Sequence, residues 1–327
     1  MTPQKTLTLD KIPPKRFDAL RIVYKGKSFT IPALFQEEWR EKNEDRTLLN
    51  DTLIEFYMCH HMWDNRYDDN TRSRLHVFNT FFFDKLQTHF RRHFHGIVPR
   101  KSEVCHDHSA TLYQKELGAH YNRMFQKTKP GILLGKDILV IPCHLKKPKH
   151  WFLILVHNPS GAILRRKVPV QSDENNNSNE ANKSMSQLQA EFAEYEERKD
   201  CRIVIMDSMC HSRKFRQLLD NAHNHAFECI KMWLQMAAAA NGDETVGSRI
   251  RKVVCQTLPK QTNGVDCGIF MMAYAEYFTW FNVEWMNQPT ETLEYLRMDD
   301  WATNELTSEV PRLRLETELH KYMVPTP

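Results

Sequence analysis

The sequence predicts an α+β fold in which a central mixed β-sheet is flanked by helices. Three short runs rich in β-branched residues and bounded by Pro, Asn or Asp are typical of central strands: Ile138–Ile141, Trp151–Val156 and Ile203–Met206. The stretch Cys267–Phe281 contains no proline and is apolar on almost every side. It therefore predicts a helix that is packed inside the domain rather than on its surface.

Length and composition fit one large domain. The chain has 327 residues, of which 41% are hydrophobic and 18 are Phe, so it can bury a sizeable core. We predict a flexible basic lead at residues 1–19 and a single domain over residues 20–327. With 45 basic and 41 acidic residues, the net charge of +4 is too balanced to imply a nucleic-acid partner.

The cysteines and the apolar runs indicate a protein of a reducing compartment. Eight cysteines occur at irregular spacing, and the first twenty residues lack the apolar core of a signal peptide. We therefore expect free thiols in the cytosol or nucleus. No uninterrupted apolar run approaches membrane-spanning length, so we expect no membrane association.

The first predicted elements in chain order are two strands and two helices. Leu20–Ile31 is expected to form two short strands about Gly26. Asn50 and Asp51 are typical capping residues, and the apolar spacing after them predicts an amphipathic helix over Asp51–Met62. A second helix is indicated by apolar residues at spacings of four: Phe78, Phe82, Leu86 and Phe90.

The second half of the chain contains an expected insertion. Pro159–Asp200 is polar and rich in Asn and Ser in its middle, which predicts a disordered insertion rather than a domain boundary. A long helix or helix pair is expected over Phe215–Leu234, followed by a loop over Ala237–Arg249. Val253–Gln256 predicts a fourth strand, and Leu315–Tyr322 a last helix.

Histidine- and cysteine-rich segments lack the spacing that metal sites usually show. Cys-His groups occur at Cys59–His61, Cys105–His108, Cys143–His144 and Cys210–His211, but none is spaced as zinc ligands are. The basic segment His89–Lys101 is ordinary for the end of a helix. We therefore expect no metal, no other cofactor and no nucleic-acid partner, with a zinc site or a basic patch as the less favoured alternatives.

Cys267 is the candidate nucleophile. Asp266 is a good N-cap, so the cysteine falls in the first helical turn, where unpaired N–H groups and the helix dipole favour a thiolate. Inert core packing is the alternative for a lone cysteine. Three neighbours favour chemistry: Asn263–Gly264 marks a tight turn, Gly268 leaves room for a substrate backbone, and the Gln261 amide can point at the same place.

A nucleophilic cysteine needs a base, and the base needs an orienting acceptor. His150 immediately precedes the run Trp151–Val156, and Asp207 immediately follows Ile203–Met206. If these two strands are antiparallel neighbours, both side chains lie at the same edge of the sheet. The tip of the apolar helix can join them there.

Four segments, in this order, resemble the ubiquitin-like-protein proteases, the family of sentrin/SUMO-specific cysteine peptidases. They are Leu48–Met58 (LLNDTLIEFYM), His150–Val156 (HWFLILV), Ile203–Ser208 (IVIMDS) and Leu258–Phe270 (LPKQTNGVDCGIF). The pattern Q-x-N-x-x-D-C-G in the last segment is the most specific. The resemblance implies a papain-like cysteine protease core. It assigns the roles of nucleophile, general base, orienter and oxyanion donor, in that order, to Cys267, His150, Asp207 and Gln261.

The resemblance also implies a tunnel that admits the Gly-Gly end of a substrate. Trp151 matches the Trp that closes one side of this tunnel, whereas Leu48 stands where the family's W-L-N-D motif has its Trp. We therefore expect substrate contacts from Trp151, Leu48, Asp51 and Gly268. The residue at Leu48 and the long insertion are more similar to the branch that trims poly-SUMO chains.

The function implied by the resemblance is a thiol isopeptidase that cleaves after the C-terminal Gly-Gly of SUMO, to free target lysines or trim SUMO chains. The implied partners are SUMO and SUMO-conjugated proteins, and we expect a monomer in the nucleus, with the cytoplasm as a second location. Three alternatives stay open. They are a NEDD8- or ubiquitin-directed peptidase of the same fold, an acyltransferase with the same order of residues, and a non-catalytic SUMO-binding module.

Overall fold

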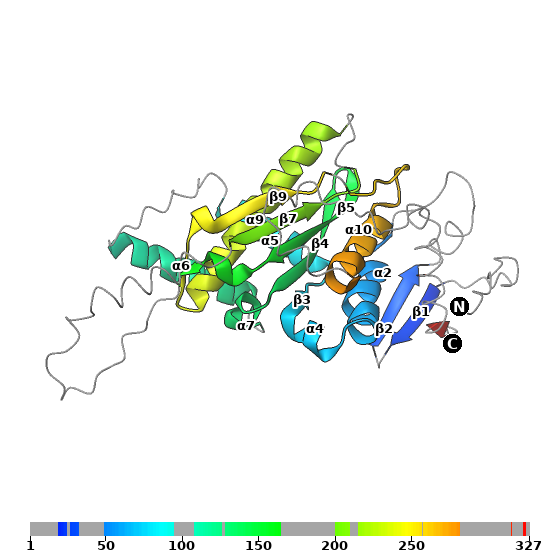
Figure 1. The fold of residues 1–327 in the computed structure, drawn as a ribbon, viewed down its shortest axis with the longest axis horizontal. Coiled ribbons are helices and arrows are strands. Elements are labelled where there is room, and N and C mark those ends of the chain that lie inside the picture. The colour runs from blue at the N-terminus through cyan, green and yellow to red at the C-terminus, as the bar shows by residue number, and fades with distance from the viewer. Residues whose placement is uncertain are drawn as a thin grey trace, which may run out of the picture.

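The computed structural model of the protein describes residues 19–24, 27–32, 49–94, 108–125, 128–164, 200–209, 215–256, 258–281, 315 and 323–324. A five-stranded mixed sheet forms its centre (Figure 1). The strands, in spatial order, are β3 (Leu75–Val77), β4 (Ile138–Lys146), β5 (Lys149–His157), β7 (Cys201–Met206) and β9 (Ile250–Val254). β5 is antiparallel to both of its neighbours, whereas β3 is parallel to β4 and β7 is parallel to β9. The predicted α+β fold is confirmed, and the three apolar runs are its three central strands.

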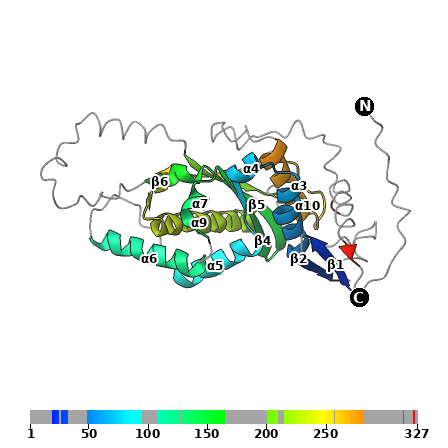
Figure 2. The ribbon, with the colours of Figure 1, turned by 90° about the horizontal axis from the view of Figure 1, so that it is seen from below.

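Helices cover both faces of this sheet (Figure 2). One face carries α2 (Asp51–Glu55), the π-helical η2 (Phe56–Met62), α10 (Cys267–Glu276) and its continuation η6 (Tyr277–Phe281). The other face carries α5 (Phe81–His93), α6 (His108–Met124), α7 (Pro130–Leu134) and α9 (Arg216–Ala240). Between η2 and β3 the chain forms the short helices α3 (Trp63–Asn65) and α4 (Asp69–Arg74).

Successive residues of β5 point to opposite helix layers. Leu153 and Leu155 belong to the core on the α10 side, whereas Phe152 and Ile154 belong to the core on the α9 side. Because both faces of the sheet are buried, its strands have continuous apolar sequences instead of alternating ones. Every residue of α10 is buried, so the predicted internal helix is confirmed and gives Cys267 a rigid support.

Two smaller sheets complete the described strands. β1 (Ala19–Tyr24) and β2 (Lys27–Pro32) form the antiparallel pair that the sequence predicts, and β10 (Met323–Val324) pairs with β1. β6 (Ile163–Leu164) pairs with β8 (Glu244–Thr245).

The structure corrects three predicted boundaries. Pro159–Ala162 forms a largely buried 3-10 turn, η3, and β6 follows it, so the start of the expected insertion is an ordered part of the fold. β6 pairs with β8, which lies about 80 residues further along the chain, and local composition cannot reveal such a distant partner. α9 continues to Ala240, and the expected loop Ala237–Arg249 also contains β8 and the 3-10 turn η5 (Gly247–Arg249). β9 begins earlier than expected because Ile250 already pairs with β7.

Some predicted features lie outside the described residues. They include nearly all of the N-terminal lead, residues 165–199 of the insertion, Leu48, and the last helix apart from Leu315, which is buried. In the part of the chain that the structure describes, no helix is both long and apolar enough to cross a membrane.

Candidate active site

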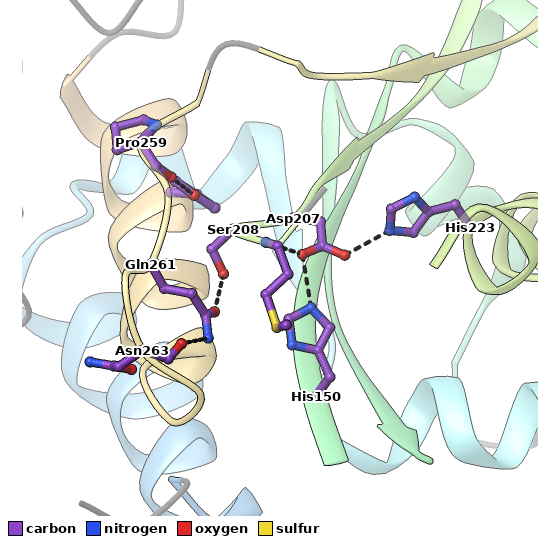
Figure 3. Close-up of polar contacts among 9 residues, drawn as sticks. His150, Asp207, Ser208, His223, Pro259, Gln261 and Asn263 are labelled. Carbon is purple, nitrogen blue, oxygen red and sulfur yellow. Dashed lines mark hydrogen bonds and ion pairs between the residues drawn. The ribbon is translucent and has the colours of Figure 1, made fainter. Parts of the chain in front are cut away.

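His150 and Asp207 meet at one edge of the central sheet. His150 is the second residue of β5, and Asp207 follows the last residue of β7. The antiparallel register pairs Leu153 with Met206, so the two polar residues lie at the same end of the sheet. His150 Nε2 is 2.8 Å from Asp207 Oδ1 (Figure 3). A carboxylate only accepts hydrogen bonds, so this contact places the ring proton on Nε2.

Cys267 is the first residue of α10, as the sequence predicts. Asp266 occupies the N-cap position, but its side chain does not cap the helix; it accepts a hydrogen bond from Asn263 Nδ2 at 2.6 Å. Asn263 Oδ1 in turn accepts from the backbone N–H groups of Val265 and Asp266, each at 3.0 Å. The turn before the helix is thus built around Asn263, and it fixes the point where Cys267 enters the first turn.

The buried neighbours of His150 favour its protonated form. Burial lowers the pKa of His150, but hydrogen bonding to Asp207 and Cys267, with the charges of both, more than offsets this and raises the pKa to about 9. Because Asp207 occupies Nε2, Nδ1 is the ring nitrogen that faces the thiol of Cys267. An imidazole beside a thiol and fixed by a carboxylate is the arrangement that general base catalysis requires.

Asp207 is fully buried, yet its charged form is favoured. Burial raises the pKa of the carboxyl, but hydrogen bonds and charge interactions with His150 and His223 hold it well below the usual range. The backbone N–H of Met209 also donates to Oδ1, at 2.7 Å. The carboxylate is therefore a fixed acceptor for His150.

The side-chain amide of Gln261 makes a hydrogen bond through its oxygen and another through its nitrogen. Ser208 Oγ donates to Gln261 Oε1 at 2.6 Å, and Gln261 Nε2 donates to the Asn263 carbonyl at 2.7 Å (Figure 3). The loop that carries Gln261 is tied to α10 because the Tyr274 hydroxyl donates to the Pro259 carbonyl. One amide hydrogen of Gln261 is occupied by Asn263, which leaves the second for an oxyanion.

Two of the expected substrate-binding residues lie next to this site. Trp151 is buried, and its Nε1 donates to the Leu49 carbonyl at 2.9 Å. Its ring packs on His144, with centroids 4.5 Å apart. Burial lowers the pKa of His144, whereas the charge of Asp51 acts to raise it. Leu48 itself lies outside the described residues.

The fourth expected substrate-binding residue, Gly268, packs against α2. A Cβ at this position would lie 3.1 Å from Leu49 Cβ and 3.3 Å from Ile54 Cδ1. The glycine allows α10 and α2 to approach closely. Leu49 and Ile54 therefore give a packing reason for the glycine, and its expected contact with a substrate backbone stays a prediction.

The sequence analysis missed His223. It lies on α9, and its Nε2 is 2.8 Å from Asp207 Oδ2 (Figure 3). The signal available in the sequence was its place on the buried stripe of that helix, with Leu219 four residues before and Ala226 three residues after it. Among the described residues, no group of three or more His, Cys, Asp or Glu could hold a metal ion.

Comparisons with known proteins agree with this fold. Residues 47–309 match the model of the Ulp1 protease family, C-terminal catalytic domain. The chain is 24% identical over 235 residues to a probable ubiquitin-like-specific protease 2B of Arabidopsis thaliana, and 21% identical over 257 residues to sentrin-specific protease 7 of Homo sapiens. Each alignment covers 72% of this chain but only 20% and 22% of those proteins, so the chain spans about a fifth of their length. A solved structure described as a de-sumoylating protease has a similar fold, with a TM-score of 0.50, 17% identity, and coverage of 93% of this chain and 91% of that one.

Proposed function

Because the chain belongs to the Ulp1 protease family of cysteine peptidases, we propose that it is an isopeptidase that cleaves after the C-terminal Gly-Gly of SUMO. The observation that carries the proposal is the buried array at the sheet edge, with Cys267 at the tip of α10 beside a His150–Asp207 pair. The names of the Arabidopsis and human relatives support a ubiquitin-like protein as substrate. The bond broken is the amide between the terminal glycine and a lysine nitrogen.

In the first half of the reaction, Cys267 is the nucleophile. Because the pKa of His150 is raised to about 9, Nδ1 already holds the thiol proton at neutral pH, and the sulfur attacks the carbonyl carbon of the terminal glycine as a thiolate. The oxyanion that forms accepts from the Gln261 amide and from the Cys267 backbone N–H, which lies among the unpaired donors of a helix start. As the C–N bond breaks, His150 gives its proton to the lysine nitrogen, leaving a thioester and a free amine.

In the second half of the reaction, water releases the modifier. A water molecule attacks the thioester carbon while His150 takes one of its protons. When the C–S bond breaks, the sulfur leaves as a thiolate paired with protonated His150, and the new carboxyl group releases the second water proton to solvent, so the modifier leaves with a terminal carboxylate. Asp207 stays charged throughout and holds the imidazole in the tautomer that both halves need.

Burial of the reacting groups favours a slender substrate. The exposed fractions of Cys267, His150 and Trp151 are 1%, 1% and 4%, so a bulky side chain next to the scissile bond would have to displace packed residues. Glycine carries no side chain and can lie close to another backbone. A Gly-Gly end that passes Trp151 is the substrate shape that fits these residues.

We further propose that the folded modifier is SUMO, that chains of SUMO are trimmed, and that the protein acts as a monomer in the nucleus. The modifier behind the Gly-Gly end must match a surface of this protein, so specificity appears as selective covalent capture. SUMO, NEDD8 and ubiquitin that carry the same C-terminal electrophile provide the test. A SUMO dimer joined by an isopeptide bond tests chain cleavage in the same series.

We expect rapid adduct formation with SUMO and little with NEDD8 or ubiquitin. Cys267→Ala should abolish the adduct, while Cys59→Ala, which removes a half-buried thiol, should not. Faster capture of NEDD8 or ubiquitin would overturn the SUMO assignment and keep the peptidase. If the folded protein forms no adduct with any modifier although its Cys267 can be alkylated, a binding module or an acyltransferase becomes the better explanation.

A further inference from the structure

Asp207 binds a second histidine that the proposed reaction does not use. His223 Nε2 lies 2.8 Å from Asp207 Oδ2, the same distance that separates His150 Nε2 from Oδ1. With the N–H of Met209 on Oδ1, the carboxylate has three polar partners. The exposed fractions of His150, Asp207 and His223 are 1%, 0% and 2%. Because the carboxylate only accepts, His223 also carries a proton on Nε2.

The two histidines reach Asp207 from different layers of the fold. His150 stands near the start of β5 and contacts Cys267 at the tip of α10. His223 comes from α9, and its ring approaches Asp207 from the side opposite α10 (Figure 3). The His223 ring also packs on Phe152, with centroids 5.5 Å apart. Phe152 lies two residues along β5 from His150. The ring is therefore held by α9 and by the strand that carries the proposed base.

We propose that His223 is a positioning residue for the Cys267 reaction, because its N–H fixes the second oxygen of Asp207 and thereby keeps the first oxygen aligned on His150. The inference rests on the proposed function, which gives His150 the role of base. A buried carboxylate oxygen without a donor is costly. It would be relieved by rotation of the carboxylate or by its protonation, and both changes weaken the hydrogen bond that orients His150.

Three variants separate this role from simple packing. His223→Gln keeps an amide N–H close to the position of Nε2, whereas His223→Phe keeps a ring against Phe152 and removes the donor. His225→Gln is the matched control on the same helix, because His225 contacts Cys229 Sγ at 3.5 Å and the ring of Phe90. The measurements are kcat and KM for a SUMO fusion with a fluorogenic leaving group, and the rate at which iodoacetamide alkylates Cys267 at pH 7.

We expect His223→Phe to lower kcat about tenfold with little change in KM, and to slow alkylation by a similar factor. His223→Gln should keep most of the wild-type rate, and His225→Gln should match wild type. Wild-type kcat in His223→Phe, or equal losses in His223→Phe and His225→Gln, would overturn the inference. A loss expressed only in KM would also count against it.

One further measurement keeps the test decisive if a variant does not fold. If His223→Phe does not fold, NMR of the protein with ¹⁵N-labelled histidine should show two strongly deshielded ring N–H protons, one of which disappears in His223→Gln. A spectrum of the wild type without that second proton would refute the hydrogen bond to Asp207. If the wild type does not cleave a SUMO fusion, the proposed function is contradicted. The His223 inference can still be tested, because alkylation of Cys267 needs no substrate.

Discussion

Two groups of histidines in this molecule lie in opposite surroundings. At the sheet edge, His150 is bonded to the carboxylate of Asp207, and its pKa is raised to about 9. Between α5 and α6, His89, His93 and His120 pack on one another, with ring centroids 4.4–5.0 Å apart. Burial, the two other histidines and nearby arginines lower the pKa of His89 to about 4.

Burial alone does not decide whether the pKa of a histidine is raised or lowered. Burial disfavours the imidazolium in both groups, and the difference comes from the neighbours. An anionic partner reverses the effect at His150, while cationic neighbours add to it at His89. His150 is therefore suited to hold and transfer a proton at neutral pH, whereas His89 is suited to stay neutral.

The largest expected effects come from replacing Cys267, His150 and Asp207 at the sheet edge. Cys267→Ala should leave no measurable cleavage of a SUMO fusion, and His150→Ala should lower kcat by about 10⁴-fold or more. Asp207→Asn should cost less, because packing and water partly replace an orienting group. Binding of SUMO should stay near wild type in Cys267→Ala, since the nucleophile adds little contact area. A milder loss in His150→Ala than in Asp207→Asn would reverse the assignment of base and orienter.

The alkaline limb of the pH–rate profile tests whether Asp207 raises the pKa of His150. His150 has a raised pKa, so it stays protonated below about pH 9, and the proton that it must donate is lost as the pH rises through that value. We expect kcat/KM to fall above about pH 9. In Asp207→Asn, the loss of the carboxylate removes the main support of the imidazolium, so the limb should move toward neutral pH. A limb that stays in place in this variant would show that Asp207 does not set the pKa of His150.

The support beneath Cys267 can be tested by a substitution that leaves every titratable group in place. Gly268→Ala brings a Cβ within 3.1 Å of Leu49 Cβ, so the buried side chain of Leu49 must shift by a few tenths of an ångström. Such overpacking typically costs about 1–3 kcal/mol of unfolding free energy. Thermal melting measures the loss, and Gly264→Ala is the control because a Cβ there meets nothing within 4 Å. Unchanged melting with a raised KM would instead support the substrate-contact role that the sequence analysis gave to Gly268.

The sequence was sufficient for the features that local pattern encodes. Strands buried on both faces produce continuous apolar runs, so β4, β5 and β7 could be found, and with them the strand ends that bear His150 and Asp207. The fully apolar helix after Asp266 was equally visible. The meeting of the two polar residues required one further assumption, that β5 and β7 are antiparallel neighbours, and the register confirms it.

The features that were missed depend on contacts between distant segments. His223 reads as one more residue of a long helix until α9 is placed against the sheet edge. α6 is an exception, because Leu117, Tyr121 and Met124 are buried and stand at i, i+4 and i+7, a helical spacing that was visible in the sequence. Ile163 reads as part of a polar insertion, because its partner Thr245 lies far along the chain. Burial against a distant partner leaves little trace in composition.

The smallest expected effect belongs to the α5–α6 histidines, and it appears in stability rather than in activity. The folded state holds the pKa of His89 near 4, below the unfolded value of about 6.5, so the unfolded state binds a proton first on acidification. The stability associated with neutral His89 is therefore complete above about pH 6.5 and is lost as the pH falls toward 4. Besides burial, the neighbours that lower the pKa of His89 are His93, His120, Arg123 and Arg92.

Removing His89 should make the melting temperature less sensitive to acid. We expect wild type to lose on the order of 2 °C more than His89→Asn between pH 7.5 and pH 5, because His89 is only partly buried and solvent screens its neighbours. Lys85→Asn on the same helix is the control, since a lysine does not titrate in this range. Equal acid sensitivity in wild type and His89→Asn would show that the cluster does not discriminate between the two protonation states. The difference in pKa between His150 and His89 would then come from the Asp207 carboxylate alone, without a contribution from the neighbours of His89.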